Sequence, residues 1–300
     1  MSAISIPKGS IQLAGLLFTP TTASASSKSP ALVIVHPAGG VKEQTAGLYA
    51  KKLAEKGFTT VCYDASYQGE SGGQPHFLED PSERVSDVWS VVDYLERLDF
   101  VDLDNIAVVG ICAGGGYAAA AAKADYRLKA LATISMIDLG DSARLGWDGN
   151  ESMMKHAETL KFVAQQIRAE NSGSEPAIAP YIPNLDDKTP YDLKEAHDYY
   201  FTPRAQHPRA ENKMLIRSLP LALTFDAFYL ADTFLKQPVL LIVGEKAGSR
   251  WHSERLDKLI GGTAKKVIIP NCTHIDLYDR EQNVDVAVKN VVDFMKEKLI

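Results

Sequence analysis

The chain has 300 residues, of which 45% are hydrophobic and 23% are charged, and its formal net charge is -6. This composition is typical of a globular protein that buries a sizeable core without disulfides or metal ions. No basic cluster is present, which excludes the charge pattern of proteins that bind nucleic acid or anionic membranes. Cys62, Cys112 and Cys272 are widely spaced and odd in number, so we expect neither a metal site nor a disulfide framework.

The first residues of the chain show no basic segment followed by an apolar run, which is the pattern of a secretory signal. No apolar stretch approaches the roughly 18 residues that a membrane-spanning helix needs. We therefore expect a cytoplasmic protein that works without a cofactor. The sequence carries no signature of an oligomeric state.

In the first half of the chain, short aliphatic runs alternate with longer segments of helical periodicity. Continuous aliphatic runs are typical of parallel strands that are covered on both faces. The expected strands cover residues 10–18, 31–35, 58–63, 106–110 and 128–135. The expected helices cover residues 45–56 and 81–98, and an alanine-rich helix ends at Lys123. This alternation predicts an α/β protein with a mostly parallel central sheet flanked by helices.

The alternation stops at about residue 138 and resumes near residue 237. Residues 138–236 show helical periodicity and proline-rich connections instead of short β-type runs. Further strands are expected at 238–243 and 266–269, and further helices at 253–260 and 284–299. We therefore predict a core formed by residues 1–137 and 237–300, with residues 138–236 inserted as a helical cap over the carboxyl edge of the sheet.

A glycine-rich turn around Cys112 follows the expected strand 106–110. Gly110 and Gly114 stand two positions before and after Cys112, as a nucleophile elbow requires where the backbone doubles back. The helix that starts behind Cys112 directs its amides and dipole at the sulfur, which favours the thiolate. The sequence thus predicts Cys112 as a nucleophile, and the alternative is an inert buried cysteine in a structural turn.

The base and the acid are expected in loops that follow later strands, because this fold delivers its nucleophile, acid and histidine in that order. His274 lies in the loop before the terminal helix and is the candidate general base. Glu245 directly follows the strand 238–243 and is the candidate acid that orients the imidazole. Asp138, after the preceding strand, is the rival acid. A cysteine–histidine pair also depends less on a third member.

Two backbone amides are expected to form the oxyanion hole. Ala113, directly after the nucleophile, supplies one of them. The second comes from the stretch His36-Pro37-Ala38-Gly39-Gly40 after an expected strand; Pro37 has no N–H, so Ala38 is the candidate. Gly39 lets a substrate approach the backbone.

Several stretches of the chain together resemble a known family. They cover residues 36–44, 63–73, 110–117, 197–204, 244–247 and 273–279. In these stretches the chain is similar to the dienelactone-hydrolase-like branch of the α/β hydrolases, which includes bacterial proteins and fungal polyketide transferases. The resemblance covers nearly the whole chain. It implies an α/β-hydrolase fold and a cysteine–histidine–acid triad, in which Cys112 is a true nucleophile. The chain departs from dienelactone hydrolases in its cap and in Glu245.

These observations predict an acyl hydrolase that cleaves an ester, thioester or lactone through an acyl-enzyme intermediate. Its substrate is a small acyl compound, free or presented on a carrier. An acyltransferase, such as a polyketide transferase, would use the same acyl-enzyme, and a binding protein on a hydrolase scaffold is a further alternative. In the cap, Tyr199, Tyr200 and Arg204 either line the acyl pocket or lock the cap onto the sheet.

Overall fold

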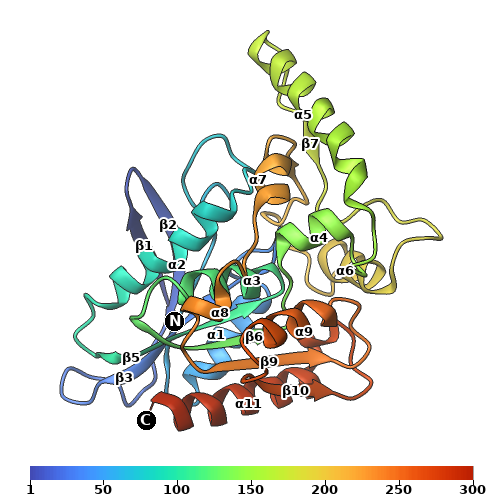
Figure 1. Ribbon diagram of the computed structural model, residues 1–300. Coiled ribbons are helices and arrows are strands. Elements are labelled where there is room, and N and C mark those ends of the chain that lie inside the picture. The colour runs from blue at the N-terminus through green and yellow to red at the C-terminus, as the bar shows by residue number, and fades with distance from the viewer. Residues whose placement is uncertain (300) are drawn as a thin grey trace.

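The computed structural model describes residues 1–299. Within this range the main sheet has eight strands in the order β1-β2-β4-β3-β5-β6-β9-β10 (Figure 1). The strands are β1 (Ser2–Lys8), β2 (Ile11–Phe18), β3 (Ser29–Val35), β4 (Thr59–Tyr63), β5 (Val101–Ile111), β6 (Leu128–Ile134), β9 (Val239–Gly244) and β10 (Lys265–Ile269). The pairs β1/β2 and β2/β4 are antiparallel, and all pairs from β4 to β10 are parallel. The predicted mostly parallel sheet is confirmed.

Helices cover both faces of this sheet. They are α1 (Thr45–Ala54), α2 (Pro81–Leu95), α3 (Ala113–Ala122), α9 (Arg250–Leu259), α10 (Asp276–Asp279) and α11 (Glu281–Leu299). Helices α2 and α3 pack together on one face, and α1 and α11 pack together on the other. Every residue of α3 is buried, because its small side chains let it lie directly on β5 and β6. This close packing holds the start of α3 firmly behind the end of β5.

The first strand, β1, was not expected from the sequence. Most of its side chains are partly or fully exposed, so it lacks the aliphatic run that marks the inner strands. It forms the edge of the sheet and pairs antiparallel with β2 along its whole length. Its place therefore depends on backbone pairing rather than on a buried face.

The segment between β6 and β9 carries further elements. They are α4 (Leu139–Leu145), the 3₁₀ turn η1 (Met153–Lys155), α5 (His156–Asn171), β7 (Ile178–Ala179), α6 (Tyr191–Phe201), β8 (Met214–Leu215), α7 (Ser218–Thr224) and α8 (Ala231–Phe234). Strands β7 and β8 form a small antiparallel pair, so the segment is not purely helical. Figure 1 shows α5 standing away from the sheet, and only Val163 of that helix is buried.

The described residues hold no group of three or more histidine, cysteine or carboxylate side chains placed to bind a metal ion. No helix within residues 1–299 combines the length and the apolar character required to cross a bilayer. The three cysteines are buried and free.

Candidate active site

Cys112 occupies a strained turn between β5 and α3. Its backbone has φ 54° and ψ −125°, a region that side-chain-bearing residues rarely adopt. A Cβ atom at Gly110 would lie 2.2 Å from the carbonyl oxygen of Gly114, and one at Gly114 would lie 2.3 Å from that of Val35. Both glycines are therefore required by the close backbone approach. This is the geometry that a nucleophile elbow needs.

The surroundings of Cys112 keep it protonated at rest. The residue is 7% exposed, and burial raises the pKa of its thiol to about 11. Interactions with the Tyr278 hydroxyl and with the backbone at Ala113 and Ala38 favour the thiolate and oppose this rise without cancelling it. The expectation that the start of the helix would favour the thiolate therefore fails in the resting protein, because the loss of water outweighs the amides. The backbone of both alanines expected to form the oxyanion hole thus favours the thiolate.

His274 lies in the turn that follows β10 and is fully buried. Its Nε2 is 3.2 Å from the hydroxyl oxygen of Tyr278, and its Nδ1 is 2.6 Å from Oγ of Ser249. Burial lowers the pKa of His274 to about 4, against the opposing charge of Asp192. The imidazole is therefore neutral at rest, as a general base must be.

The structure does not bring either expected acid to His274. Glu245 is exposed, and its carboxylate accepts a hydrogen bond from the backbone N–H of Asn271 at 2.9 Å. Within residues 1–299 no hydrogen bond joins Glu245 to His274, whose Nδ1 is occupied by Ser249. In this structure the Glu245 side chain points to the loop after β10 rather than to the imidazole.

Asp138 is also committed elsewhere. Its carboxylate caps α4 by accepting from the N–H of Gly140 at 2.9 Å, and it pairs with Arg255 at 3.3 Å. Burial and the neighbouring carboxylates Asp141 and Asp226 raise the pKa of Asp138. Its side chain thus joins α4 to the core rather than orienting the histidine.

The carboxylate beside His274 comes instead from Asp192, near the start of α6. It accepts hydrogen bonds from the backbone N–H of Gly248 at 2.7 Å, from Nε1 of Trp147 at 3.0 Å and from the backbone N–H of His274 at 3.3 Å. Asp192 and His274 are 82 residues apart in the sequence, and no spacing rule connects them. Asp192, like Ser249 and Tyr278, was therefore missed by sequence reasoning.

Cys112 and His274 open into one cavity of about 200 Å³. Residues from the core that line it are Ala38, Cys112, Ile137, His274, Ile275 and Tyr278. Residues from the segment 138–236 that line it are Leu139, Ser142, Trp147, Tyr181, Ile182, Leu193, Ala196 and Tyr200. All of these side chains are apolar, hydroxylated or aromatic apart from the cysteine and the neutral histidine, so the wall carries no charge.

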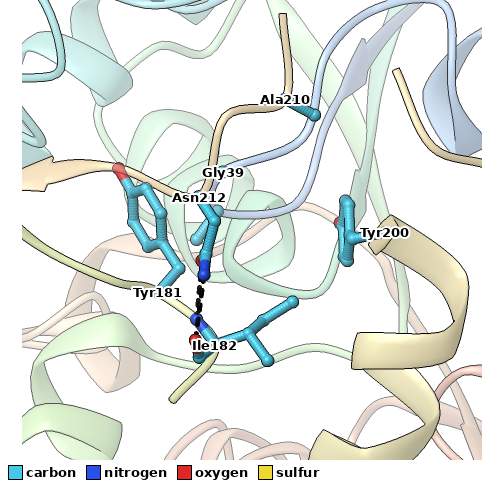
Figure 2. A pocket seen from close by; sticks show the side chains of 7 residues that line it. Gly39, Tyr181, Ile182, Tyr200, Ala210 and Asn212 are labelled. Carbon is cyan, nitrogen blue, oxygen red and sulfur yellow. Dashed lines mark hydrogen bonds between the residues drawn. The ribbon is translucent and has the colours of Figure 1, made fainter. Parts of the chain in front are cut away.

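A smaller pocket adjoins this cavity and shares Ala38, Tyr181, Ile182 and Tyr200 with it (Figure 2). Its volume is about 10 Å³, enough for one water molecule. Gly39 lies there with φ +67°, and a Cβ atom at this position would be 2.8 Å from the Tyr181 ring. The glycine therefore allows the ring to approach the loop that carries Ala38.

Tyr181 is held in place from outside the cavity. Its hydroxyl donates to the buried carboxylate of Glu79 at 2.7 Å and accepts from the side-chain amide of Gln68 at 3.0 Å. Glu79 also accepts from the hydroxyl of Tyr117 on α3. This network ties a wall of the cavity to the helix behind the elbow.

The four residues expected to bind substrate divide into two groups. Gly39 and Tyr200 lie at the pockets, as described above. Arg204 instead pairs with Asp279, at 2.6 and 2.7 Å, and with Asp198 at 3.1 Å. Tyr199 is buried, with its ring edge-on to Tyr278 at a centroid distance of 5.2 Å. Arg204 and Tyr199 thus hold α6 against α10. This agrees with the alternative that these side chains lock the cap in place instead of lining the acyl pocket.

Comparison with known proteins identifies the family. Residues 8–209, more than half of the chain, match the family described as X-Pro dipeptidyl-peptidase (S15 family). The chain belongs to this family. It is also 42% identical over 294 residues to the uncharacterized protein YcjY of Escherichia coli K12, which covers 96% of this chain and 95% of that protein. A polyketide transferase of Penicillium, grgF, is 24% identical over 248 residues, or 82% of this chain and 81% of its own.

Solved structures share the fold over nearly the whole chain. The crystal structure of the hypothetical protein PA2218 from Pseudomonas aeruginosa superposes with a TM-score of 0.93 at 33% identity, covering 99% of this chain and 93% of that one. The α/β hydrolase GrgF from Penicillium gives 0.82 at 20% identity, covering 99% and 98%. Est1E from Butyrivibrio proteoclasticus, solved with ferulic acid, gives 0.65 at 21%, covering 99% of each chain.

These similarities confirm the predicted α/β-hydrolase fold. The protein is an enzyme of the α/β-fold hydrolase and acyltransferase class. The cysteine nucleophile and the placement in the dienelactone-hydrolase branch stay predictions.

Proposed function

We propose that the protein is an acyl hydrolase in which Cys112 forms an acyl-enzyme and His274 is the general base. The observation that carries this proposal is the convergence on one sulfur atom of the strained elbow, the Ala38 and Ala113 backbone and the Tyr278 hydroxyl, which also bonds His274. A structural turn around an inert cysteine would need the two glycines. It would not need donors aimed at the sulfur from two different loops.

The chemistry follows from these positions. Loss of the Cys112 proton to the base leaves a thiolate that attacks the carbonyl carbon of an ester, thioester or lactone. The amides of Ala38 and Ala113 stabilise the oxygen that becomes negative in the tetrahedral intermediate. The protonated His274 then gives its proton to the leaving group, and afterwards takes a proton from the water that releases the acid.

The cavity indicates a small and neutral acyl group. Its volume of about 200 Å³ lies below the range of about 300–1,000 Å³ that holds drug-sized ligands. Its wall carries no charged side chain that could pair with a carboxylate or a phosphate. A cleft formed partly by residues 138–236 supports the role of this segment as a cap.

Acyl transfer to an alcohol or a carbanion is the second candidate. The relative named polyketide transferase and the 7% exposure of Cys112 favour it, because an acyl-enzyme shielded from water survives long enough to meet another acceptor. The same residues would form the acyl-enzyme in either case.

A substrate panel tests the proposal. The panel contains p-nitrophenyl esters from acetate to decanoate, small lactones, acyl thioesters of N-acetylcysteamine and an Ala-Pro anilide that represents the activity named by the family. We expect turnover of short, uncharged esters or thioesters, and mass spectrometry should find the acyl group on the peptide that contains Cys112. Cleavage of the anilide alone, without an adduct on Cys112, would contradict the proposal.

The identity of the acid is tested by four variants in one assay. Asp192→Asn removes the charge beside His274 and should lower kcat by about tenfold or more, since a loss of one pKa unit of imidazolium stabilisation is worth that factor. Ser249→Ala should also lower kcat, because Nδ1 loses its partner. Glu245→Gln should keep a near-normal kcat. Asp138→Asn should too, with its melting temperature measured alongside because Asp138 is buried.

If Glu245→Gln lowered kcat more than Asp192→Asn did, Glu245 would be the acid that orients His274. Normal rates in all four variants would mean that Cys112 and His274 act as a pair without an acid.

A further inference from the structure

Tyr278 lies between the nucleophile and the base. It is on α10, four residues after His274, which lies just before that helix. Its hydroxyl oxygen is 3.2 Å from Nε2 of His274. Its interaction with Cys112 favours the thiolate and lowers the pKa of that thiol. The ring is 2% exposed, and it lines the same cavity as the other two residues. The proposed function uses this hydroxyl as a neighbour of the sulfur and gives it no part in proton transfer.

The hydrogen-bond partner of Nε2 of His274 determines which proton this atom can take. A general base normally lies within about 2.6–3.2 Å of the group whose proton it takes. Here the partner of Nε2 at that range is the phenol of Tyr278, and the phenol in turn contacts the sulfur. A phenolic hydroxyl can donate one hydrogen bond and accept another at the same time. It can therefore connect a thiol to an imidazole.

We propose that Tyr278 is a catalytic residue that relays the proton of Cys112 to His274. At rest the thiol donates to the Tyr278 oxygen, and the Tyr278 hydroxyl donates to Nε2. In the step, the S–H bond breaks as a new O–H bond forms, and the original O–H bond breaks as an N–H bond forms on Nε2. The products are a thiolate, a neutral tyrosine and an imidazolium, so protons and charge balance without another reactant.

The neighbouring groups fit this direction of transfer. Nδ1 of His274 donates to Oγ of Ser249 in the tautomer that leaves Nε2 free to accept, and Asp192 stabilises the imidazolium that forms. Burial raises the pKa of Tyr278 well above its usual value, so the phenol does not hold a negative charge and both protons move together. The Tyr200 ring lies edge-on to the Tyr278 ring, at a centroid distance of 6.5 Å, and both line the cavity.

The relay rests on the proposed function, but alkylation of Cys112 tests it without any acyl substrate. Iodoacetamide reacts with the thiolate, and peptide mapping separates Cys112 from Cys62 and Cys272. Tyr278→Phe removes the hydroxyl that stabilises the thiolate, so we expect Cys112 to react at least about tenfold more slowly between pH 7 and 9. Tyr199→Phe is the matched control, since it removes a hydroxyl from the ring packed against Tyr278 and should react like the wild type.

The second measurement is the acylation burst with the best ester of the panel. Tyr278→Phe should acylate about 10²-fold more slowly or worse, as expected when proton transfer is lost. The rate of the wild-type burst should be measured in mixtures of H₂O and D₂O. We expect its dependence on the deuterium fraction to be that of a step in which two protons move. This measurement needs no variant, so it stays decisive if Tyr278→Phe fails to fold.

The relay would be overturned if the isotope dependence of the wild-type burst rate showed that only one proton moves. It would also be overturned if a folded Tyr278→Phe variant were alkylated and acylated at the wild-type rates. Acylation that persists in Cys112→Ala would instead overturn the proposed function.

Discussion

Cys112→Ala is expected to abolish formation of the acyl-enzyme and to lower kcat on the order of 10⁴-fold or more. The effect is large because alanine removes the attacking atom, while the Ala38 and Ala113 amides and the cavity remain in place. Steady-state kinetics with the best ester and intact-mass spectrometry of the burst measure the loss. The fold should persist, since the turn is held by Gly110 and Gly114 rather than by the sulfur.

Cys62→Ala is the matched control for this variant. Cys62 is a buried cysteine too, but it lies on β4 with its sulfur near the carbonyl oxygen of Lys42. We expect Cys62→Ala to keep its kcat. If Cys112→Ala and Cys62→Ala were equally active, Cys112 would not be the nucleophile.

His274→Ala is expected to lower kcat by about 10²- to 10⁴-fold, the range for loss of a general base. Within the described part of the chain, the neutral imidazole is the group next to the Tyr278 hydroxyl that can take up the proton of Cys112. Tyr200 cannot do so, because burial raises its pKa and its phenol keeps its own proton. Since His274 is fully buried, His274→Gln should be measured as well, because it preserves most of the side-chain volume. Thermal unfolding then separates loss of base from loss of fold.

His252→Ala provides the comparison for a second buried histidine. Its ring stacks on Trp251 at a centroid distance of 3.6 Å, and its Nδ1 accepts from the N–H of Asp138. We expect a lower melting temperature with kcat within a few-fold of the wild type. If His252→Ala lost its activity and His274→Ala kept a normal activity, the general base would be His252.

The inner strands and the nucleophile turn were predictable because their signals are local. Continuous aliphatic runs predicted β3, β5, β6 and β9, and a strand with both faces covered carries that pattern wherever it lies in the sheet. Gly110 and Gly114 were predictable for a similar reason, since the backbone clash that they avoid involves residues close in the chain or in the adjoining strand. By contrast, β1 was missed because an edge strand has little aliphatic pattern.

The partners of the site residues were decided by the tertiary structure. Glu245 follows the strand where an acid was expected, but its carboxylate turns to Asn271, while Asp192 on α6 accepts from the backbone N–H of His274. Which carboxylate approaches an imidazole depends on how two distant segments pack, and a side-chain contact over such a separation leaves no periodicity in the sequence.

The charge state of the nucleophile was decided in the same way. The sequence by itself determined the alternation of the inner strands and helices, the strained turn at Cys112 and the presence of a histidine after the last strand. Only the tertiary structure determined that Cys112 is buried, that its pKa is raised to about 11, and that Tyr278 lies between it and His274. The physical reason is that backbone conformation follows from neighbouring residues, whereas desolvation and hydrogen-bond partners depend on every segment that closes over the site.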